Sequence, residues 1–91
     1  MRYKLSKKAD DDFKKIYKYT YINHGERQAD KYTESLEDCF LLIFENQNIG
    51  RSVNDISKGL LRHEHQEHII FYRIKTSHIF IVRIRHNSED I

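Results

Sequence analysis

The chain has 91 residues, of which 33% are charged and 38% hydrophobic, with a net charge of +2 and a mean hydropathy of −0.79. These values predict a single domain over residues 1–91 and exclude a second core, a membrane span and a collagen-like fibre. The lone Cys39 excludes a disulfide framework, and the N-terminus lacks the apolar stretch of a secretory signal, so we expect a soluble, cytoplasmic protein.

The N-terminal half predicts one strand followed by two helices. Residues Arg2–Leu5 alternate polar and apolar side chains, as a half-buried strand does. Ser6 suits the N-cap of a first helix, whose apolar stripe comprises Ala9, Phe13, Ile16, Tyr17 and Tyr21. Gly25 is placed to end this helix, and a second begins near Glu26 with a stripe of Ala29, Tyr32, Leu36, Phe40, Ile43 and Phe44. So short a connection predicts an antiparallel helical hairpin, with Cys39 as a buried hydrophobe beside the second stripe.

The C-terminal half predicts a loop and then three strands. Residues 45–59 are polar and contain two glycines, which indicates an ordered loop. After them come three segments with strand character, at Leu60–His65, His68–Lys75 and Ile79–Arg85. Short turns at residues 66–67 and 76–78 join them into an antiparallel meander. The expected fold class is α+β, in the order β-α-α-β-β-β.

Strand parity places a candidate binding surface on the last two strands. A turn of three residues, 76–78, between these strands would pair Ile74 with Phe80 and Arg73 with Ile81. One face would then be wholly apolar and pack under the helices, with Ile70, Tyr72, Ile74, Phe80, Val82 and Ile84. The opposite face would join apolar residues to arginines, namely Ile69, Phe71, Ile79, Ile81, Arg73, Arg83 and Arg85. A turn of two residues would shift this register, and we would then expect Arg73 on the other face.

We interpret the mixed face as a docking groove for a partner segment, because contiguous exposed apolar area marks interfaces. The alternative is an amphipathic surface on which arginine stems cover apolar side chains. Residues 58–86 carry a net charge of +4, whereas residues 25–57 carry −4. The basic segment suits an acidic peptide or a phosphate backbone.

Other chemical signatures are weak or absent. His63, His65 and His68 are close in sequence, but no cysteine completes a zinc site, and we interpret them as surface or interface residues. The three glycines do not have the spacing of a phosphate-binding loop. No metal or other cofactor is therefore expected.

Four stretches match a known family in order and spacing. Residues 3–13 are similar to its strand-then-helix start, with a Ser-x-x-Ala spacing, and residues 25–32 are similar to its inter-helix turn. Glu45-Asn46 followed by Ile49-Gly50-Arg51 is similar to its ENP-x-x-G-R loop, with Gln47 where proline is usual. The most specific stretch combines residues 59–62, 68–73 and 81–86. The chain thus resembles the ParE toxins of the RelE/ParE superfamily, the toxin half of type II toxin–antitoxin pairs.

The resemblance implies a fold, a target and a partner. ParE toxins have a helical hairpin on a small antiparallel sheet, act on DNA gyrase, and are neutralised by a ParD-like antitoxin whose tail folds onto them. Toxin and antitoxin together repress their operon, so contact with operator DNA is expected only through the antitoxin. On the mixed face that strand parity predicts, we expect the antitoxin or the target to contact Arg62, Ile69, Phe71, Arg73, Ile79, Ile81, Arg83 and Arg85. No membrane partner is implied.

The residues also favour one branch of the superfamily. RelE relatives cut mRNA on the ribosome, which requires acid–base groups and cations at the scissile phosphate. Here such a site would use Arg62, Arg83 and His86, but it lacks the C-terminal tyrosine of RelE-type sites. We therefore expect a non-enzymatic gyrase inhibitor. The alternatives are a RelE-like mRNA endonuclease and a toxin, attenuated by its short C-terminus, that acts as an antitoxin-binding co-repressor.

Overall fold

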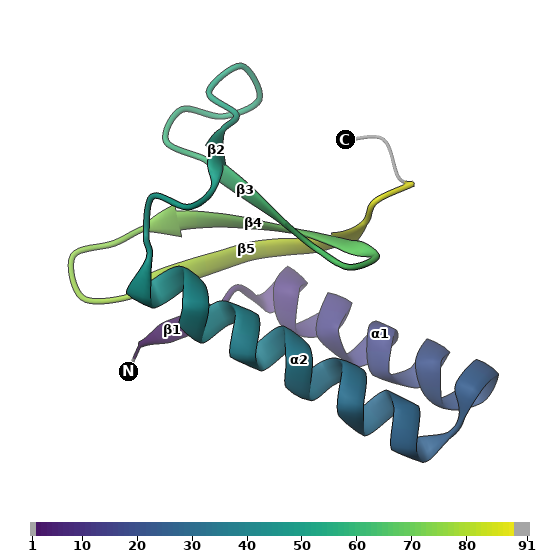
Figure 1. Ribbon diagram of the computed structural model, residues 1–91. Coiled ribbons are helices and arrows are strands. Elements are labelled where there is room, and N and C mark those ends of the chain that lie inside the picture. The colour runs from purple at the N-terminus through teal and green to yellow at the C-terminus, as the bar shows by residue number, and fades with distance from the viewer. Residues whose placement is uncertain (1, 89–91) are drawn as a thin grey trace.

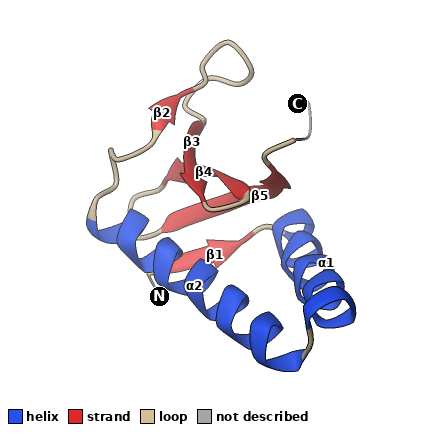
Figure 2. Cartoon of the chain, turned by 45° about the vertical axis from the view of Figure 1, so that its right-hand side comes forward, coloured by secondary structure: helices blue, strands red, loops and turns tan. Residues whose placement is uncertain are grey.

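Two helices lie against one face of a five-stranded sheet in the computed structural model, which describes residues 2–88 (Figures 1 and 2). The elements follow in the order β1 Tyr3–Leu5, α1 Lys7–His24, α2 Glu26–Glu45, β2 Arg51–Ser52, β3 Leu61–His65, β4 His68–Ile74 and β5 Ile79–His86. The strand order is β1-β5-β4-β3-β2. Strand β1 runs parallel to β5, and the other neighbours are antiparallel. The expected α+β fold is confirmed. The expected N-terminal strand β1 joins the meander beside β5, and the short β2 joins it beside β3.

Helix α1 begins where the sequence predicts and is tied to the sheet at that point. The Ser6 hydroxyl accepts the backbone N–H of Ala9 at 3.0 Å, as an N-cap does. The same hydroxyl donates to the carbonyl of Val82 on β5 at 2.7 Å. Gly25, with a φ of 89°, lies between the two helices, and its N–H donates to the Tyr21 carbonyl. Within the described residues, neither helix is long and apolar enough to cross a membrane.

The buried stripe of α1 differs from the predicted one in its second half. Ala9 and Ile16 are buried as expected, but the third buried position is Thr20. Its hydroxyl donates to the Ile16 carbonyl at 2.8 Å, which satisfies the buried oxygen within the helix. Tyr17 and Tyr21 instead stack on each other, and Tyr21 is 50% exposed. The helical spacing of Tyr17 and Tyr21 therefore did not indicate that they are buried.

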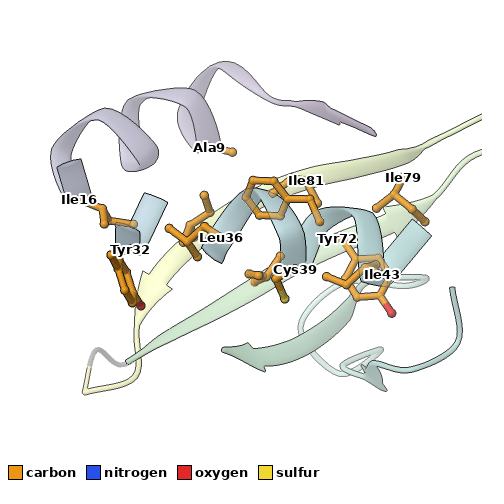
Figure 3. Packing of buried hydrophobic residues seen from close by; sticks show 12 residues of the cluster. Ala9, Ile16, Tyr32, Leu36, Cys39, Ile43, Tyr72, Ile79 and Ile81 are labelled. Carbon is orange, nitrogen blue, oxygen red and sulfur yellow. The ribbon is translucent and has the colours of Figure 1, made fainter. Parts of the chain in front are cut away.

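Helix α2 supplies most of the core that the helices share with the sheet. Its predicted stripe is confirmed, because Tyr32, Leu36 and Ile43 are buried. Figure 3 shows α2 side chains meeting residues of the sheet. Cys39 is 4% exposed, and burial raises its pKa to about 11, so the thiol is a protonated core residue.

The predicted register of β4 and β5 is wrong at the turn. Ile74 lies opposite Ile79, not Phe80, and Arg73 lies opposite Phe80, not Ile81. Near the turn the strands follow the two-residue alternative, since the Lys75 N–H donates to the His78 carbonyl. A shift between Phe71 and Tyr72 then leaves Val82 unpaired as a β-bulge. Beyond the bulge, Phe71 lies opposite Arg83.

This bulge reverses the predicted faces of the first half of β5. Ile79 and Ile81 are fully buried in the core beneath the helices, where Figure 3 shows them beside α2. Phe80 and Val82, predicted to face the helices, lie on the other side of the sheet, where Val82 joins a second cluster. Arg73 stays on that outer side, because its own strand keeps the predicted parity. Ile84 faces the helices as expected.

A small second core covers part of the outer face, the sheet face away from the helices. Ile69 and Phe71 are 6% and 3% exposed and pack with Leu60, Val53 and Val82. Residues 53–60, which follow β2, form a compact loop whose turns are closed by backbone hydrogen bonds. The outer face is therefore partly sealed by the chain itself.

Candidate functional site

The outer face brings together five of the eight residues predicted to bind a partner. Arg62 lies opposite Phe71, and Ile69 lies opposite Arg85, so these four share one face. Arg73 follows two positions after Phe71 on the same strand. The set therefore surrounds the second core rather than lining an open groove.

Arginines give this outer face a positive charge. Arg51 of β2 lies opposite Arg62, which adds one more guanidinium to the row. Glu64 partly balances them, with its carboxylate 3.2 Å from Arg62 and 3.9 Å from Arg51. The Arg51 and Glu64 side chains are 75% and 68% exposed, so these pairs are well hydrated and weak. A partner carboxylate could therefore compete with Glu64.

Ile79 and Ile81 do not belong to this surface. Both have no exposed area, and both pack in the core between the sheet and the helices. The bulge at Val82 explains the error, because a one-residue change of register exchanges the faces of every residue that precedes it.

Arg73 holds the chain's own loop. One guanidinium nitrogen donates to the Lys58 carbonyl at 2.6 Å, and the other donates to the Ser57 hydroxyl at 2.5 Å. These bonds fix residues 57–58 over the outer face. Its predicted role in binding a partner must therefore compete with a structural one.

Arg83 points to helix α1 rather than to the outer face. Its guanidinium makes two hydrogen bonds to the Asp12 carboxylate, at 2.8 and 3.0 Å, and the Ile84 N–H donates to the same group at 3.0 Å. Burial raises the pKa of Asp12, but the bonds from Arg83 and Ile84 and the charges of Arg83 and Arg85 outweigh it and lower the pKa. Arg83 is thus removed from the predicted groove.

The structure does not bring together the residues expected for RNA cleavage, namely Arg62, Arg83 and His86. The His86 ring contacts His68 on the helix side of the sheet. Arg62 lies on the outer face opposite Phe71, and Arg83 is paired with Asp12. No single phosphate could meet all three side chains, because the sheet separates the first two.

Two of the clustered histidines, His65 and His68, contact α2 from the sheet. The Ser35 hydroxyl lies 3.0 Å from Nε2 of His65, and the Tyr32 hydroxyl lies 2.5 Å from Nδ1 of His68. Burial, and to a smaller extent the nearby His63, lower the pKa of His65, which favours its neutral form. Over residues 2–88 no three potential ligand side chains are grouped to hold a metal ion.

A cleft of about 820 Å³ opens between α1 and the β3–β4 turn. Its lining includes apolar and aromatic side chains from the helices and polar side chains from the sheet, namely Lys15, Ile16, Tyr19, Thr20, His24, Gln28, Tyr32, Gln66, Glu67, His68 and His86. Burial raises the pKa of Tyr32 to about 12, so its hydroxyl stays protonated at neutral pH. This volume is in the range of sites that enclose a small ligand or an anchoring side chain.

Sequence reasoning missed the cleft and the role of Asp12. An aspartate near a helix start is favoured by the helix dipole alone, and nothing in the spacing of Asp12 indicates a partner 71 residues away. The lining of the cleft comes from four elements and a turn, so no local pattern could have indicated it. The C-terminal residues 89–91, to which the attenuated-toxin alternative refers, lie outside the described residues.

Comparison with known proteins identifies relatives over nearly the whole chain. A protein-family model described as the ParE toxin of the type II toxin–antitoxin system parDE matches residues 3–91. Toxin ParE1 of Caulobacter vibrioides is 29% identical over 86 residues, which cover 94% of this chain and 88% of that protein. The solved structure of the chromosomal ParDE TA system from P. aeruginosa matches with a TM-score of 0.77 and 25% identity, over 94% of this chain and 95% of that chain. The sequence family and the fold therefore agree.

Proposed function

Because this chain belongs to the ParE toxin family of type II toxin–antitoxin systems, we propose that it arrests growth by binding and inhibiting DNA gyrase. A ParD-like antitoxin neutralises it by direct contact. Both partners act in the cytoplasm, and the protein inhibits by binding rather than by catalysis.

The separation of Arg62 from His86 supports binding over RNA cleavage. Cleavage of a phosphodiester requires an acid–base group and cations around the same phosphorus. Here the sheet lies between the predicted cation and the predicted acid–base group, and Arg83 is occupied by Asp12. A RelE-like ribonuclease would need all three rearranged.

The outer face is the proposed contact for acidic residues of the antitoxin. Arg62 and Arg85 lie on adjacent rows of the sheet, and Arg51 extends the charge to its edge. A disordered acidic tail that folds on binding would be attracted by this charge and would meet the rim of the second core. Electrostatic attraction dominates this contact, because Ile69 and Phe71 are buried and expose little apolar area to a partner.

Expression of the chain alone, with a DNA-damage reporter and a translation reporter in the same cells, tests the target. Inhibition of gyrase predicts growth arrest with induction of the DNA-damage response while translation continues. Early translation arrest with cleaved mRNA would instead indicate the RelE-like alternative, and unaffected growth would indicate an attenuated co-repressor. Co-expression of the antitoxin encoded in the same operon is the control that should restore growth.

A further inference from the structure

Two arginines converge on one carboxylate oxygen at the edge of the outer face. Arg51 and Arg62 lie opposite each other on β2 and β3, so their side chains share a face of the sheet. Oε1 of Glu64 lies 3.2 Å from Nη2 of Arg62 and 3.9 Å from Nη2 of Arg51. The position of this oxygen is therefore an anion site between two guanidinium groups.

Hydrogen bonds hold the backbone on both sides of Arg51. Before it, the Gly50 N–H donates to the Tyr72 hydroxyl at 2.9 Å. After β2, the Val53 N–H donates to the Leu60 carbonyl at 2.9 Å. The backbones that carry the two arginines are thus fixed beside each other before any ligand arrives, which lowers the entropic cost of binding.

Glu64 does not satisfy both guanidinium groups. Within residues 2–88, Nε of Arg62 is enclosed by the protein and has no hydrogen-bond partner. The Arg51 and Glu64 side chains are largely exposed, so the pairs that Glu64 makes are hydrated and weak. A phosphate group binds arginine through two parallel hydrogen bonds and has more acceptor oxygens than a carboxylate. Such a group would displace Glu64 at little cost.

A second pair of cations lies on the same face. Arg73 donates to the carbonyl of Lys58, so this loop lysine lies near it, and the Lys58 residue is exposed. With Asp55 and Glu64 included, the two pairs comprise four basic residues against two acidic ones, a net charge of +2. Duplex DNA carries one negative charge per about 1.7 Å of its axis, so its backbone can meet both pairs at once.

We propose that the site between Arg51 and Arg62 binds a phosphodiester group of duplex DNA and that Glu64 occupies this site until DNA displaces it. In Figure 1 the edge strand β2 and the loop after it project away from both helices, which leaves this edge accessible to a long, rigid partner. The inference rests on the proposed function only in naming DNA, the substrate of gyrase, as the nucleic acid. The protein would then contact the DNA of a gyrase–DNA complex as well as the enzyme.

Binding of a short labelled DNA duplex to the full chain, followed by fluorescence anisotropy at several salt concentrations, tests the inference. We expect binding that weakens as the salt concentration rises, because phosphate contacts release counterions. Arg51→Gln should weaken binding about three- to tenfold and reduce the slope of log affinity against log salt by about one. Absence of binding by the wild type at low salt, or an unchanged slope in Arg51→Gln, would overturn the proposal.

Glu64→Gln tests the competition within the site. It removes the carboxylate but keeps the shape of the side chain, so it should tighten DNA binding about three- to tenfold. The gain should be smaller when Arg51→Gln is also present, because the two substitutions act on one site. Glu34→Gln, at an exposed position of α2, makes the same change in net charge and is the matched control. An equal gain in Glu34→Gln would mean that net charge, not the site, governs binding.

Two other probes decide the class of the ligand. A glutamate-rich peptide and a single-stranded RNA replace the duplex at the same salt concentration. Tighter binding of the peptide would assign the site to an acidic protein partner, and tighter binding of the RNA would favour the RelE-like alternative. Either result would overturn the assignment to duplex DNA.

The outcome is separable from that of the proposed function, because duplex binding is measured without gyrase. Inhibition of gyrase by a protein that does not bind the duplex would overturn the DNA site and leave the proposed target in place. Duplex binding without inhibition of gyrase would support the site and remove the target.

Discussion

Four arginines of the C-terminal strands have four different environments. Arg62 lies on the outer face beside Glu64, Arg73 holds the loop over that face, and Arg83 is paired with Asp12. Arg85 lies opposite Ile69 and contributes to the low pKa of Asp12. Their sequence positions alone predict one shared role, whereas the structure places Arg62 and Arg85 on the outer face and uses Arg73 and Arg83 for internal contacts.

The pair between Asp12 and Arg83 makes a testable contribution to stability. Its side chains are 12% and 31% exposed, so Asp12→Asn should lower the free energy of unfolding at pH 7 by about 1–3 kcal/mol. The folded pKa of Asp12 is lowered, so its stabilisation is complete above the unfolded value and is lost as the pH falls through the folded one. Urea unfolding should therefore show the two proteins converging in strong acid.

The control for this pair is Asp11→Asn, at the exposed neighbouring position on α1. A loss at pH 7 as large for Asp11→Asn as for Asp12→Asn would mean that the Arg83 contact contributes nothing specific.

Gly50 is required by the close approach of Tyr72. The Tyr72 hydroxyl accepts the Gly50 N–H at 2.9 Å and donates to the Gln47 carbonyl at 2.8 Å. A Cβ at position 50 would lie 2.6 Å from that hydroxyl oxygen and 2.8 Å from the Arg62 carbonyl. Gly50→Ala should thus destabilise the fold by about 1–3 kcal/mol in thermal or urea unfolding, with the exposed Asn48→Ala as the control. An unchanged midpoint for Gly50→Ala would contradict this close contact.

At the level of elements, the helices, the strands and the antiparallel meander could be predicted, but the register of β5 and the pairing of β1 could not. The stripe through Leu36 and Ile43 and the cap at Ser6 are local signals, and both are confirmed. The bulge at Val82 and the parallel pairing of β1 with β5 depend on contacts far apart in sequence. Strand β5 has isoleucines at odd and even positions, as Ile79, Ile81 and Ile84 show. Both of its faces are therefore apolar, and hydrophobicity alone does not fix its register.

The faces of the candidate site residues were predicted less well than the fold for the same reason. Arg62, Ile69 and Phe71 were placed together correctly because their strands, β3 and β4, pair without irregularity. Residues of β5 before the bulge were assigned to the wrong face. The loop over the outer face could not be predicted, because residues 53–59 contain only two apolar residues, Val53 and Ile56, which are too few for a pattern that would indicate the contacts of Val53 and Leu60 with the sheet.

The loop of residues 53–60 depends on Arg73. Arg73→Ala removes the bonds to Lys58 and Ser57, so the loop should open more often and expose Phe71. We expect about tenfold faster hydrogen exchange at the Ile56 and Leu60 amides, whose bonds close the loop.

The matched control for the loop is Lys75→Ala, which removes an exposed cation from the end of the same strand-turn unit. Exchange at the loop amides should then stay at the wild-type rate. Equal protection in Arg73→Ala and wild type would show that the Arg73 bonds do not hold the loop.

At the scale of the whole molecule, the sheet separates two surfaces with different chemistry. The outer face carries permanent guanidinium charge around a nearly sealed core, and the cleft carries imidazoles beside exposed apolar side chains.

Reversal of charge on the outer face should weaken the complex with the antitoxin. The double variant Arg62→Glu and Arg85→Glu should lose at least about tenfold in affinity, and the remaining affinity should be less sensitive to salt. Lys18→Glu and Lys31→Glu make the same change in net charge at exposed helix positions and serve as the control. Calorimetric titration at two salt concentrations is the measurement. Equal losses in both double variants would indicate a nonspecific effect of net charge.

A supercoiling assay with purified gyrase tests the central claim most directly. The protein alone should inhibit supercoiling of relaxed plasmid in proportion to its concentration, and prior addition of the antitoxin should restore activity. In parallel, ribosomes programmed with mRNA should show no cleavage. Full gyrase activity at a saturating concentration of folded protein, together with cut mRNA, would contradict the account.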